Sequence, residues 1–341
     1  MTDNCFLRAC RRESVPYTPI WLMRQAGRYQ ASYRELRAQV SFLELCKTPE
    51  LATKVTVEAV EQFGFDAAII FSDILPILEP MGAELEYVGG SKPKIHNPVR
   101  TAIEIDDLRE LETVDSLNYV FEALAMTRRA LPNDLPLIGF CGAPFTLASY
   151  LIEGGGSKNF VETKKLMYGD AGAWHALLEK LSRALVKYLN RQAAAGADAL
   201  QIFDSWVGCL SPADYREFVL PHSKFIIDNV VKDVPVIHFG TGTATLLELI
   251  TEAGGDVIGV DWHSNLDDAW RKIGYHKAVQ GNLDPVTLFA PRDFLLQKAA
   301  LVLAQAENRN GHIFNLGHGI LPETPVDNVK ALVDFVHEYK H

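Results

Sequence analysis

The segment LMRQAGRYQASYR (22–34) gathers arginines in a chain whose formal net charge is -10. Arg24 and Arg28 flank residues 25–27 and directly follow a run of apolar residues. Guanidinium groups bind carboxylates through paired N–H donors, and Gly27 lets the backbone bend close to a ligand. A lone arginine is more often an ordinary surface residue. This paired arrangement instead predicts a binding site for a small anion.

A carboxylate follows a second apolar run. The stretch AAIIFSD (67–73) ends in Ser72 and Asp73, and both residue types suit the N-cap of a helix. A carboxylate held among Phe71, Ile74 and their apolar neighbours would be poorly solvated, and it would seek hydrogen-bond donors or a cation. The sequence leaves both interpretations of Asp73 open, a helix cap or a functional group.

Short apolar runs recur along the chain, with helical patterns between them. Continuous runs are typical of strands buried on both faces, as in parallel sheets. Leucines three and four residues apart at 177–189, and segments that stop at Gly254 and Gly274, predict the intervening helices. A doubly wound open sheet is the main alternative, but RQAGRY lacks its G-x-G-x-x-G pattern. The predicted strands are 19–24, 67–73, 136–142, 199–205, 235–240, 257–262, 277–282 and 312–319.

Strand followed by helix, repeated along the chain, predicts an α/β fold of the (β/α)8 TIM-barrel type. We expect a single domain over residues 1–341 that begins with a short polar, arginine-rich segment. In such barrels the active site lies at the C-terminal ends of the strands, because the loops that follow the strands converge there. The first three crossovers are the longest, so we expect them to build the pocket.

This rule turns the strand ends into candidate functional positions. His318 lies between two glycines and has little steric shielding. The histidines are scattered without the close spacing that marks metal ligands, so no metal site is predicted. The strand-end candidates are Arg24, Asp73, Asp204, Ser205, His238, Gly240, Asp261, His263 and His318.

Composition narrows the function classes. The net charge and a pI near 5.5 argue against a nucleic-acid partner. Residues 1–37 nevertheless hold seven arginines and three acidic residues, a local net charge of +4. The five cysteines form no C-x-x-C pair and are odd in number, which suits reduced thiols in a cytoplasmic protein. The polar N-terminus and the lack of any apolar run near ~18 residues predict no signal peptide and no membrane association.

Several segments together resemble those of the uroporphyrinogen decarboxylase family: PIWLMRQAGRY, IIFSDILP, GFCGAPFTLASYLIEGGGS, FDSWVG and FNLGHGI. The resemblance extends in order from about residue 6 to residue 335. It implies a single barrel, a homodimer, no cofactor, and stepwise removal of CO2 from the four acetate arms of uroporphyrinogen to give coproporphyrinogen. That substrate carries eight carboxylates, so the arginines would bind its arms while the rest of the protein stays acidic.

The resemblance also implies the site residues, with Asp73, Arg24 and Arg28 as the catalytic ones. Position 205 is serine where relatives can have threonine, and either residue supplies a hydroxyl. The implied substrate contacts are Arg24, Gln25, Ala26, Gly27, Arg28, Asp73, Tyr150, Ser205 and His318.

The chemistry of the substrate gives Asp73 a specific role. Loss of CO2 from a carboxymethyl arm leaves an electron pair that needs a sink, and a pyrrole offers one only after a ring carbon is protonated. A fixed carboxylate near the ring nitrogens would stabilise this cation and accept hydrogen bonds from the ring N–H groups. The proton donor stays open. A histidine near its free pKa is the conventional acid. The resemblance instead implies Arg24 or Arg28, although an arginine is a poor acid unless its environment is unusual, and His318 would then orient the substrate.

Two rival functions remain. Corrinoid-linked methyltransferases share the fold but bind zinc through an H-x-C pair at the fifth strand and a later cysteine. Here that stretch reads HFG (238–240), and no cysteine follows Cys209. A noncatalytic tetrapyrrole-binding protein would keep the arginines but would not need a poorly solvated Asp73.

Overall fold

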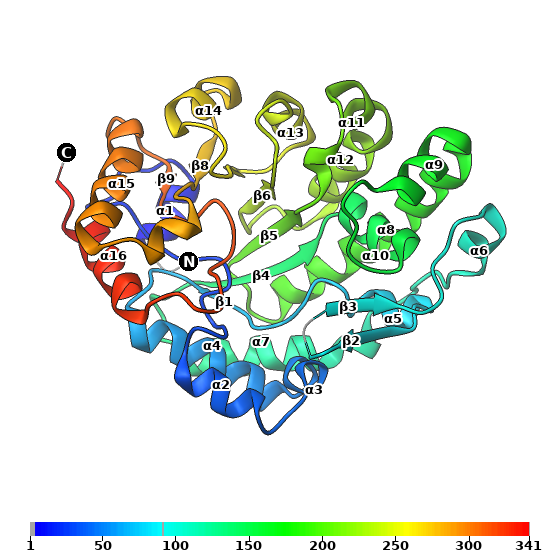
Figure 1. Ribbon diagram of the computed structural model, residues 1–341, viewed down its shortest axis with the longest axis horizontal. Coiled ribbons are helices and arrows are strands. Elements are labelled where there is room, and N and C mark those ends of the chain that lie inside the picture. Colours follow the sequence, from blue (N-terminus) through cyan, green and yellow to red (C-terminus); the bar gives the residue numbers. More distant parts are fainter. Residues whose placement is uncertain (1–3, 91, 341) are drawn as a thin grey trace.

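The computed structural model describes residues 4–90 and 92–340 of the chain. Within them, parallel strands form one curled sheet: β1 (Ala68–Ile69), β4 (Leu137–Gly142), β5 (Ala199–Asp204), β6 (Val236–Gly240), β7 (Val257–Gly259), β8 (Ala278–Gln280) and β9 (His312–Ile313). Their order in space is their order along the chain. Figure 1 shows these strands in the interior, with the helices arranged around them.

A short segment around Ile20 closes the barrel between β9 and β1. Ile20 forms a parallel bridge with Phe314, and the Phe314 N–H donates to the Pro19 C=O over 2.8 Å. On the other side, the Asp66 N–H donates to the Ile20 C=O over 2.9 Å. With this segment every predicted strand position is filled, and the (β/α)8 barrel class is confirmed.

The prediction of a regular strand over 19–24 is nevertheless wrong, because this segment forms only the isolated bridge at Ile20. The Ile20 N–H donates to a side-chain oxygen of Asp66 over 2.7 Å, and the Met23 N–H donates to that of Asn315 over 3.1 Å. Side chains therefore replace the ladder bonds of a strand. Arg24 then leaves the extended conformation, with φ at 63°.

Helices follow the strands as predicted. The leucines of 177–189 are buried on α10 (Ala171–Ala194), and α13 (Leu247–Ala253) and α14 (Leu266–Ile273) are followed by Gly254 and Gly274. The remaining helices are α1 (Cys5–Cys10), α2 (Ala31–Arg37), α3 (Phe42–Lys47), α4 (Pro49–Phe63), α5 (Leu78–Met81), α6 (Ala102–Asp107), α7 (Asn118–Ala130), α8 (Pro144–Glu153), α9 (Val161–Gly169), α11 (Pro212–Phe218), α12 (Leu220–Asn229), α15 (Arg292–Gln305) and α16 (Val326–Glu338), with 3-10 turns η1 (Asp115–Leu117), η2 (Val207–Cys209) and η3 (Pro285–Phe289). No helix in the described part of the chain is long and apolar enough to cross a membrane.

The second crossover contains an antiparallel hairpin that the sequence did not predict. It consists of β2 (Leu85–Val88) and β3 (Lys92–Ile95). The Ile95 N–H donates to the Gly154 C=O over 2.9 Å, which ties the hairpin to the end of α8. Strands this short, one of them containing a proline, have no continuous apolar run for a sequence pattern to detect.

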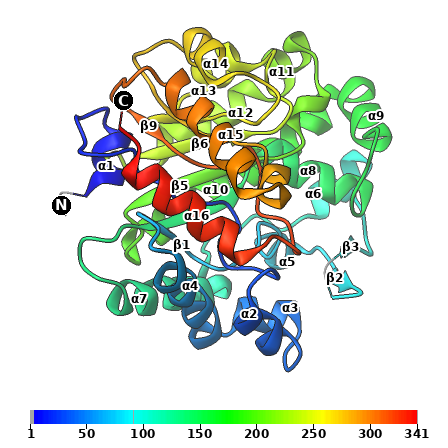
Figure 2. The ribbon, with the colours of Figure 1, turned by 60° about the vertical axis from the view of Figure 1, so that its left-hand side comes forward.

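Asp66 joins three parts of the chain at the N-terminal end of β1. Its carboxylate accepts hydrogen bonds from the Tyr17 hydroxyl over 2.9 Å, from the Ile20 N–H over 2.7 Å and from the His337 ring over 2.8 Å. Figure 2 shows that α16, which carries His337, lies alongside α15. The barrel-closing segment, β1 and the C-terminal helix therefore share one buried acid.

We expect His337→Gln to lower the midpoint of thermal unfolding more at pH 5.5 than at pH 8.5. The hydrogen bond to Asp66 raises the pKa of His337, burial opposes it, and the Asp66 charge adds to the rise. A raised pKa in the folded state gives stability that is fully present below the unfolded value of about 6.5 and lost as pH rises through the folded value. For a partly exposed pair the effect is about 1 kcal/mol or less. His276→Gln, which removes an exposed histidine, serves as control. A difference that does not change with pH would contradict this expectation.

Candidate active site

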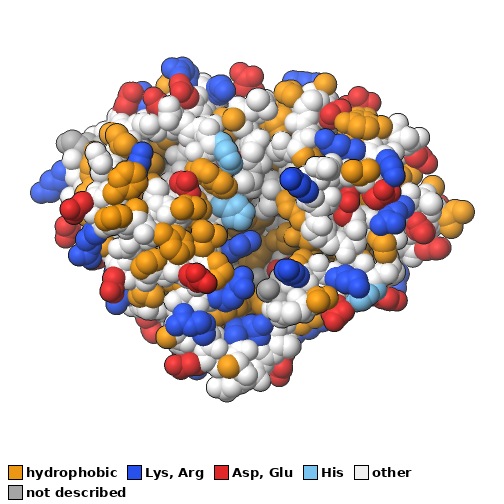
Figure 3. Space-filling view, in the orientation of Figure 1, with side chains coloured by type: hydrophobic (Ala, Val, Ile, Leu, Met, Phe, Trp, Pro, Cys, Tyr) orange, Lys and Arg blue, Asp and Glu red, His pale blue; other side chains and the backbone are white. Residues whose placement is uncertain are grey.

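A cavity of about 680 Å³ opens at the C-terminal ends of the strands. Figure 3 shows it as a hollow bordered by Lys and Arg side chains. Its walls come from the barrel-closing segment, the β2–β3 hairpin, α8, and the loops that follow β1, β5 and β9. The sequence-predicted contacts all line this cavity: Arg24, Gln25, Ala26, Gly27, Arg28, Asp73, Tyr150, Ser205 and His318.

Several other polar or aromatic residues line the cavity and were not predicted as site residues. Arg34 and Arg37 lie in the arginine-rich segment, so charge clustering could have indicated them. Tyr87 comes from the unpredicted hairpin and had no sequence signal. Thr146 and Trp206 lie within segments that carried the family resemblance, but nothing in their types or spacing set them apart.

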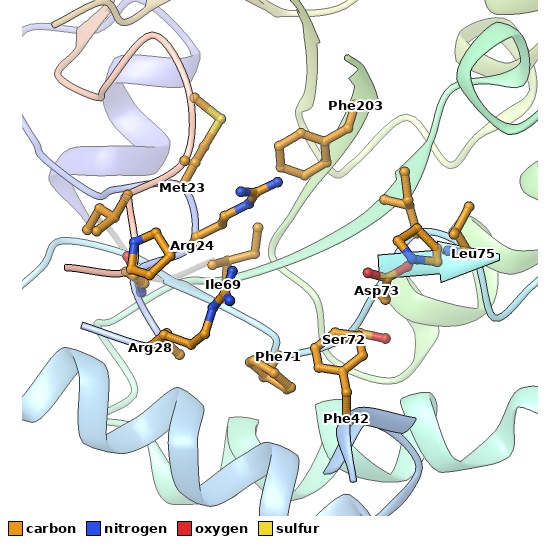
Figure 4. Close-up of a pocket in the computed structure, with 18 of the residues that line it drawn as sticks. Met23, Arg24, Arg28, Phe42, Ile69, Phe71, Ser72, Asp73, Leu75 and Phe203 are labelled. Atoms are coloured by element: carbon orange, nitrogen blue, oxygen red, sulfur yellow. Dashed lines mark hydrogen bonds between the residues drawn. The ribbon is translucent and has the colours of Figure 1, made fainter. Parts of the chain in front are cut away.

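The arginines near the N-terminus separate into structural and free groups. Arg34 donates to the Arg28 C=O over 2.9 Å, and Arg37 donates to the Gly90 C=O over 3.1 Å. Among the described residues, the guanidinium groups of Arg24 and Arg28 have no hydrogen bond or ion pair. Figure 4 shows both side chains at the same side of the cavity. This pair is therefore available to an external anion.

Arg24 is held in an unusual backbone conformation. Its φ of 63° is in the left-handed region, which costs an L-residue about 1–2 kcal/mol. Its side chain passes directly over Gly319, where a Cβ would lie only 2.4 Å from Arg24 Cδ. Although the guanidinium borders the open cavity, the protein around it lowers the pKa of Arg24 by desolvation, and the charge of Asp73 opposes this shift.

Gln25 has a structural part in the same segment. Its side chain is buried, and its amide N–H donates to the Ala67 C=O over 3.1 Å while its amide oxygen accepts from the Leu22 N–H over 3.3 Å. The Tyr29 hydroxyl donates to the Gln25 C=O over 2.6 Å. Gln25 therefore holds the arginine segment against β1, and its amide is already occupied.

Asp73 lies across the cavity from the arginines (Figure 4). One carboxylate oxygen accepts the Leu75 N–H over 2.9 Å. The next helix, α5, has its N-cap at Ile77, so Asp73 stabilises a turn and is not a helix cap. Burial raises the pKa of Asp73, while the adjacent Tyr87 hydroxyl, the Leu75 N–H and the charge of Arg24 oppose the rise. The Tyr87 oxygen is buried without a hydrogen bond of ordinary geometry to any described residue.

His318 presents a neutral ring to the cavity. Burial, together with the charge of Arg24, lowers the pKa of His318 to about 4. Its Nδ1 accepts the Gly319 N–H over 2.7 Å, so the neutral ring carries its proton on Nε2. The two flanking glycines allow this close packing, because a Cβ at Gly317 would lie 2.3 Å from the Trp262 nitrogen. His318 can therefore donate a hydrogen bond to an anion.

Two further predicted contacts bring hydroxyl groups to the cavity. Tyr150 comes from α8 and Ser205 from the loop after β5. Burial raises the pKa of Tyr150 to about 12, and the charge of Asp73 adds to the rise. The phenol therefore stays protonated at neutral pH, and both residues offer uncharged hydroxyl groups to a ligand.

The remaining strand-end candidates lie outside the cavity wall: Asp204, His238, Gly240, Asp261 and His263. His238 precedes Phe239, which lines the cavity, so the alternation of side chains along β6 turns the histidine outward. Within residues 4–90 and 92–340, no group of three or more His, Cys, Asp or Glu side chains is arranged to hold a metal ion.

This arrangement defines a class of protein. It is a TIM barrel whose strand-end cavity places two unpaired arginines and a neutral histidine opposite one half-buried carboxylate, which suits a ligand that carries several carboxylates. The family model for "Uroporphyrinogen decarboxylase (URO-D)" matches residues 1–339. The chain belongs to the uroporphyrinogen decarboxylase family.

The relatives agree over nearly the whole length. The uroporphyrinogen decarboxylase of Carboxydothermus hydrogenoformans is 55% identical over 337 residues, which cover 98% of this chain and 96% of the relative. That of Sorangium cellulosum is 56% identical over 333 residues, which cover 97% and 95%. The resemblance seen in the sequence segments is confirmed.

Solved structures show the same fold with other names. A methyltransferase from Methanosarcina mazei superposes with a TM-score of 0.78 at 24% identity and covers 97% of each chain. A B12-independent methionine synthase from Shewanella sp. reaches 0.60 at 10% identity, covering 87% of this chain and 90% of that one. At these identities the likeness shows the fold alone.

We expect Gly319→Ala and Gly317→Ala to have different effects. A Cβ at Gly319 meets only the flexible side chain of Arg24, whereas one at Gly317 meets the backbone of Asp261 and Trp262. Because the added methyl group displaces only the Arg24 side chain, Gly319→Ala should keep its unfolding temperature. The displaced guanidinium should weaken binding of a polycarboxylate such as mellitate about tenfold, roughly 1.4 kcal/mol. Gly317→Ala should lose several degrees of thermal stability. Mellitate affinity by calorimetry and thermal unfolding test both. Unchanged binding in Gly319→Ala would show that Arg24 does not hold the anion.

Proposed function

We propose that this chain decarboxylates uroporphyrinogen to coproporphyrinogen, removing the four acetate carboxylates in turn. Each step consumes one proton and releases one CO2, and the acetate arm becomes a methyl group. The observation that carries the proposal is the opposition, across one cavity, of the unpaired Arg24 and Arg28 to Asp73, a half-buried carboxylate whose pKa is raised by burial (Figure 4). The arginines can bind the carboxylates of an octacarboxylate substrate, and Asp73 can stabilise a pyrrole cation.

In this proposal the cationic wall binds and orients the arms of the substrate. Arg24 and Arg28 form paired hydrogen bonds with carboxylates. His318 Nε2–H and the hydroxyls of Tyr150 and Ser205 donate further hydrogen bonds. The arm that reacts needs its carboxylate turned out of the pyrrole plane, so that the breaking C–C bond overlaps the ring π system.

Asp73 acts on the ring itself. Its carboxylate accepts the pyrrole N–H groups and stabilises the positive charge that appears when a ring carbon is protonated. This charge supplies the electron sink for loss of CO2. The poorly solvated position raises the pKa of Asp73 but also strengthens its attraction for the cation.

The donor of the proton is proposed to be Arg24 or Arg28. Desolvation lowers the pKa of Arg24, which moves this guanidinium toward a usable acid. His318, with a pKa lowered to about 4, is neutral at pH 7 and has no acidic proton to give. That state supports its proposed role as an orienting residue.

We also propose that the chain works as a single-domain homodimer in the cytoplasm and without a cofactor. Apolar side chains are exposed on η3 and α15, namely Val286, Phe289, Phe294 and Leu301, and these could support self-association. Sedimentation equilibrium tests the dimer, and cell fractionation tests the location.

The proposed activity is tested by incubating the purified protein anaerobically with reduced uroporphyrinogen and separating the products by carboxylate number. We expect heptacarboxylate to tetracarboxylate products, with full activity after exhaustive chelation, because the macrocycle is its own electron sink. Tight binding without turnover would indicate a carrier instead. Activity that is lost on chelation and restored by zinc would favour the methyltransferase alternative.

Two substitutions at Asp73 separate its proposed role from a structural one. Asp73→Asn keeps the acceptor for the Leu75 N–H but removes the charge, whereas Asp73→Glu keeps the charge and moves it by one methylene. If the charge stabilises the cation, Asn should lower kcat about 100-fold or more, roughly 2.7 kcal/mol, and Glu should retain more activity. Steady-state kinetics with thermal unfolding as the stability control decide this. A fully active Asp73→Asn protein would remove the catalytic role.

A further inference from the structure

The ring of Tyr150 is held from one side by a second aromatic side chain in the cavity. The rings of Tyr150 and Trp206 stack with centroids 3.8 Å apart and planes 29° from parallel. Phe160 packs against Trp206 in turn, with centroids 5.2 Å apart. Trp206 is half-buried and lines the cavity, so it is not a core residue.

The backbone of Trp206 is fixed by the same helix that carries Tyr150. The Trp206 N–H donates to the Thr146 hydroxyl oxygen over 3.3 Å, and the Thr146 hydroxyl donates to Asp204 over 2.7 Å. Thr146 and Tyr150 are four residues apart on α8, so they lie on one face of that helix. Thr146 thus holds the backbone of Trp206 while Tyr150 packs against its ring.

This double connection leaves the phenol little freedom. A tyrosine ring that borders an open cavity can ordinarily change rotamer, because nothing fills the space beside it. Here the indole occupies that space, and it cannot turn away without losing its packing on Phe160, while the bond to Thr146 fixes the backbone from which it projects. The hydroxyl of Tyr150 stays beside the charges of Arg24 and Asp73, both of which act on its ionisation.

We propose that Trp206 is a positioning residue that holds the Tyr150 hydroxyl in the orientation required to bind the substrate. Trp206 acts through Tyr150 and not through a contact of its own with the substrate. The inference rests on the proposed decarboxylase function. It gives a role to a residue whose type and sequence position did not indicate one.

A double-mutant cycle tests the proposal. The variants are Trp206→Leu, which fills the site without an aromatic face, Tyr150→Phe, which keeps the ring but loses the hydroxyl, and their combination. Trp206→Phe keeps a stacking face. Phe335→Leu serves as control. Phe335 lies on α16, away from the cavity, and its substitution removes a comparable ring contact, the one with Tyr339. Each protein is assayed for kcat and KM with uroporphyrinogen, for uroporphyrin affinity by fluorescence, and for thermal unfolding.

We expect Trp206→Leu and Tyr150→Phe each to lower kcat/KM by about tenfold, which corresponds to roughly 1.4 kcal/mol. The double variant should be no worse than Tyr150→Phe, because the two changes remove the same interaction. Trp206→Phe should keep most of the activity, and the control should match the wild type.

Losses that multiply in the double variant would overturn the proposal, since Trp206 would then act independently of the Tyr150 hydroxyl. Full activity in Trp206→Leu or in Tyr150→Phe would overturn it equally. If Trp206→Leu does not fold, the cycle is run with Trp206→Met, which also lacks an aromatic face, and losses that multiply with Tyr150→Phe have the same meaning. A wild-type protein without turnover would refute the proposed function instead, and the uroporphyrin affinities of the same variants would still decide the coupling.

Discussion

The seam where the barrel-closing segment meets the end of β9 is the constraint on which the site depends. The Phe314 N–H donates to the Pro19 C=O, the Met23 N–H to the Asn315 side chain, and the Ile320 N–H to the Met23 C=O over 2.9 Å. These bonds close the barrel, and they also set the residues on either side of it. Arg24 lies over Gly319 and next to His318 because these hydrogen bonds hold the two segments of the seam in one register. The energy of barrel closure therefore offsets the left-handed conformation of Arg24.

The partners of the arginines explain how a protein with an overall negative charge has a cationic cavity wall. Like charges on neighbouring arginines repel, and only some of these arginines have internal partners. Arg34 and Arg37 donate hydrogen bonds to backbone carbonyls, whereas Arg24 and Arg28 stay unpaired. Asp73 lies across the cavity and forms no ion pair with them, so a bound substrate does not have to displace an internal salt bridge. An internal salt bridge would have neutralised both groups, whereas separation keeps both charges available.

The sequence predicted the strand ends better than the strands. The continuous apolar runs located the strands along the chain. The parallel order of the strands and the positions of Asp73 and His318 at strand ends then followed from the barrel rule. It could not show that Ile20 and Met23 bond to side chains from distant segments, which is why the strand over 19–24 was wrong. Nor could it detect the hairpin that brings Tyr87 to Asp73, because two four-residue strands carry no periodic signal. Gln25 was identified as a contact by resemblance, but its amide serves the fold.

A solved methyltransferase has the same fold, with a TM-score of 0.78, and a fold by itself does not determine which reaction a protein catalyses. β4 and β6 each offer one side chain to the cavity, Phe140 and Phe239, and the register of the strand determines which one. In β6 the register sends Phe239 inward and turns His238 outward, where both ring nitrogens are buried without a hydrogen bond of ordinary geometry to any described residue. A zinc-binding H-x-C pair at this position would need a ligand at 240, where the chain has glycine. We propose that the same barrel supports polyanion chemistry here because its cavity presents guanidinium groups, an imidazole and a single carboxylate, which a few residues at the strand ends supply.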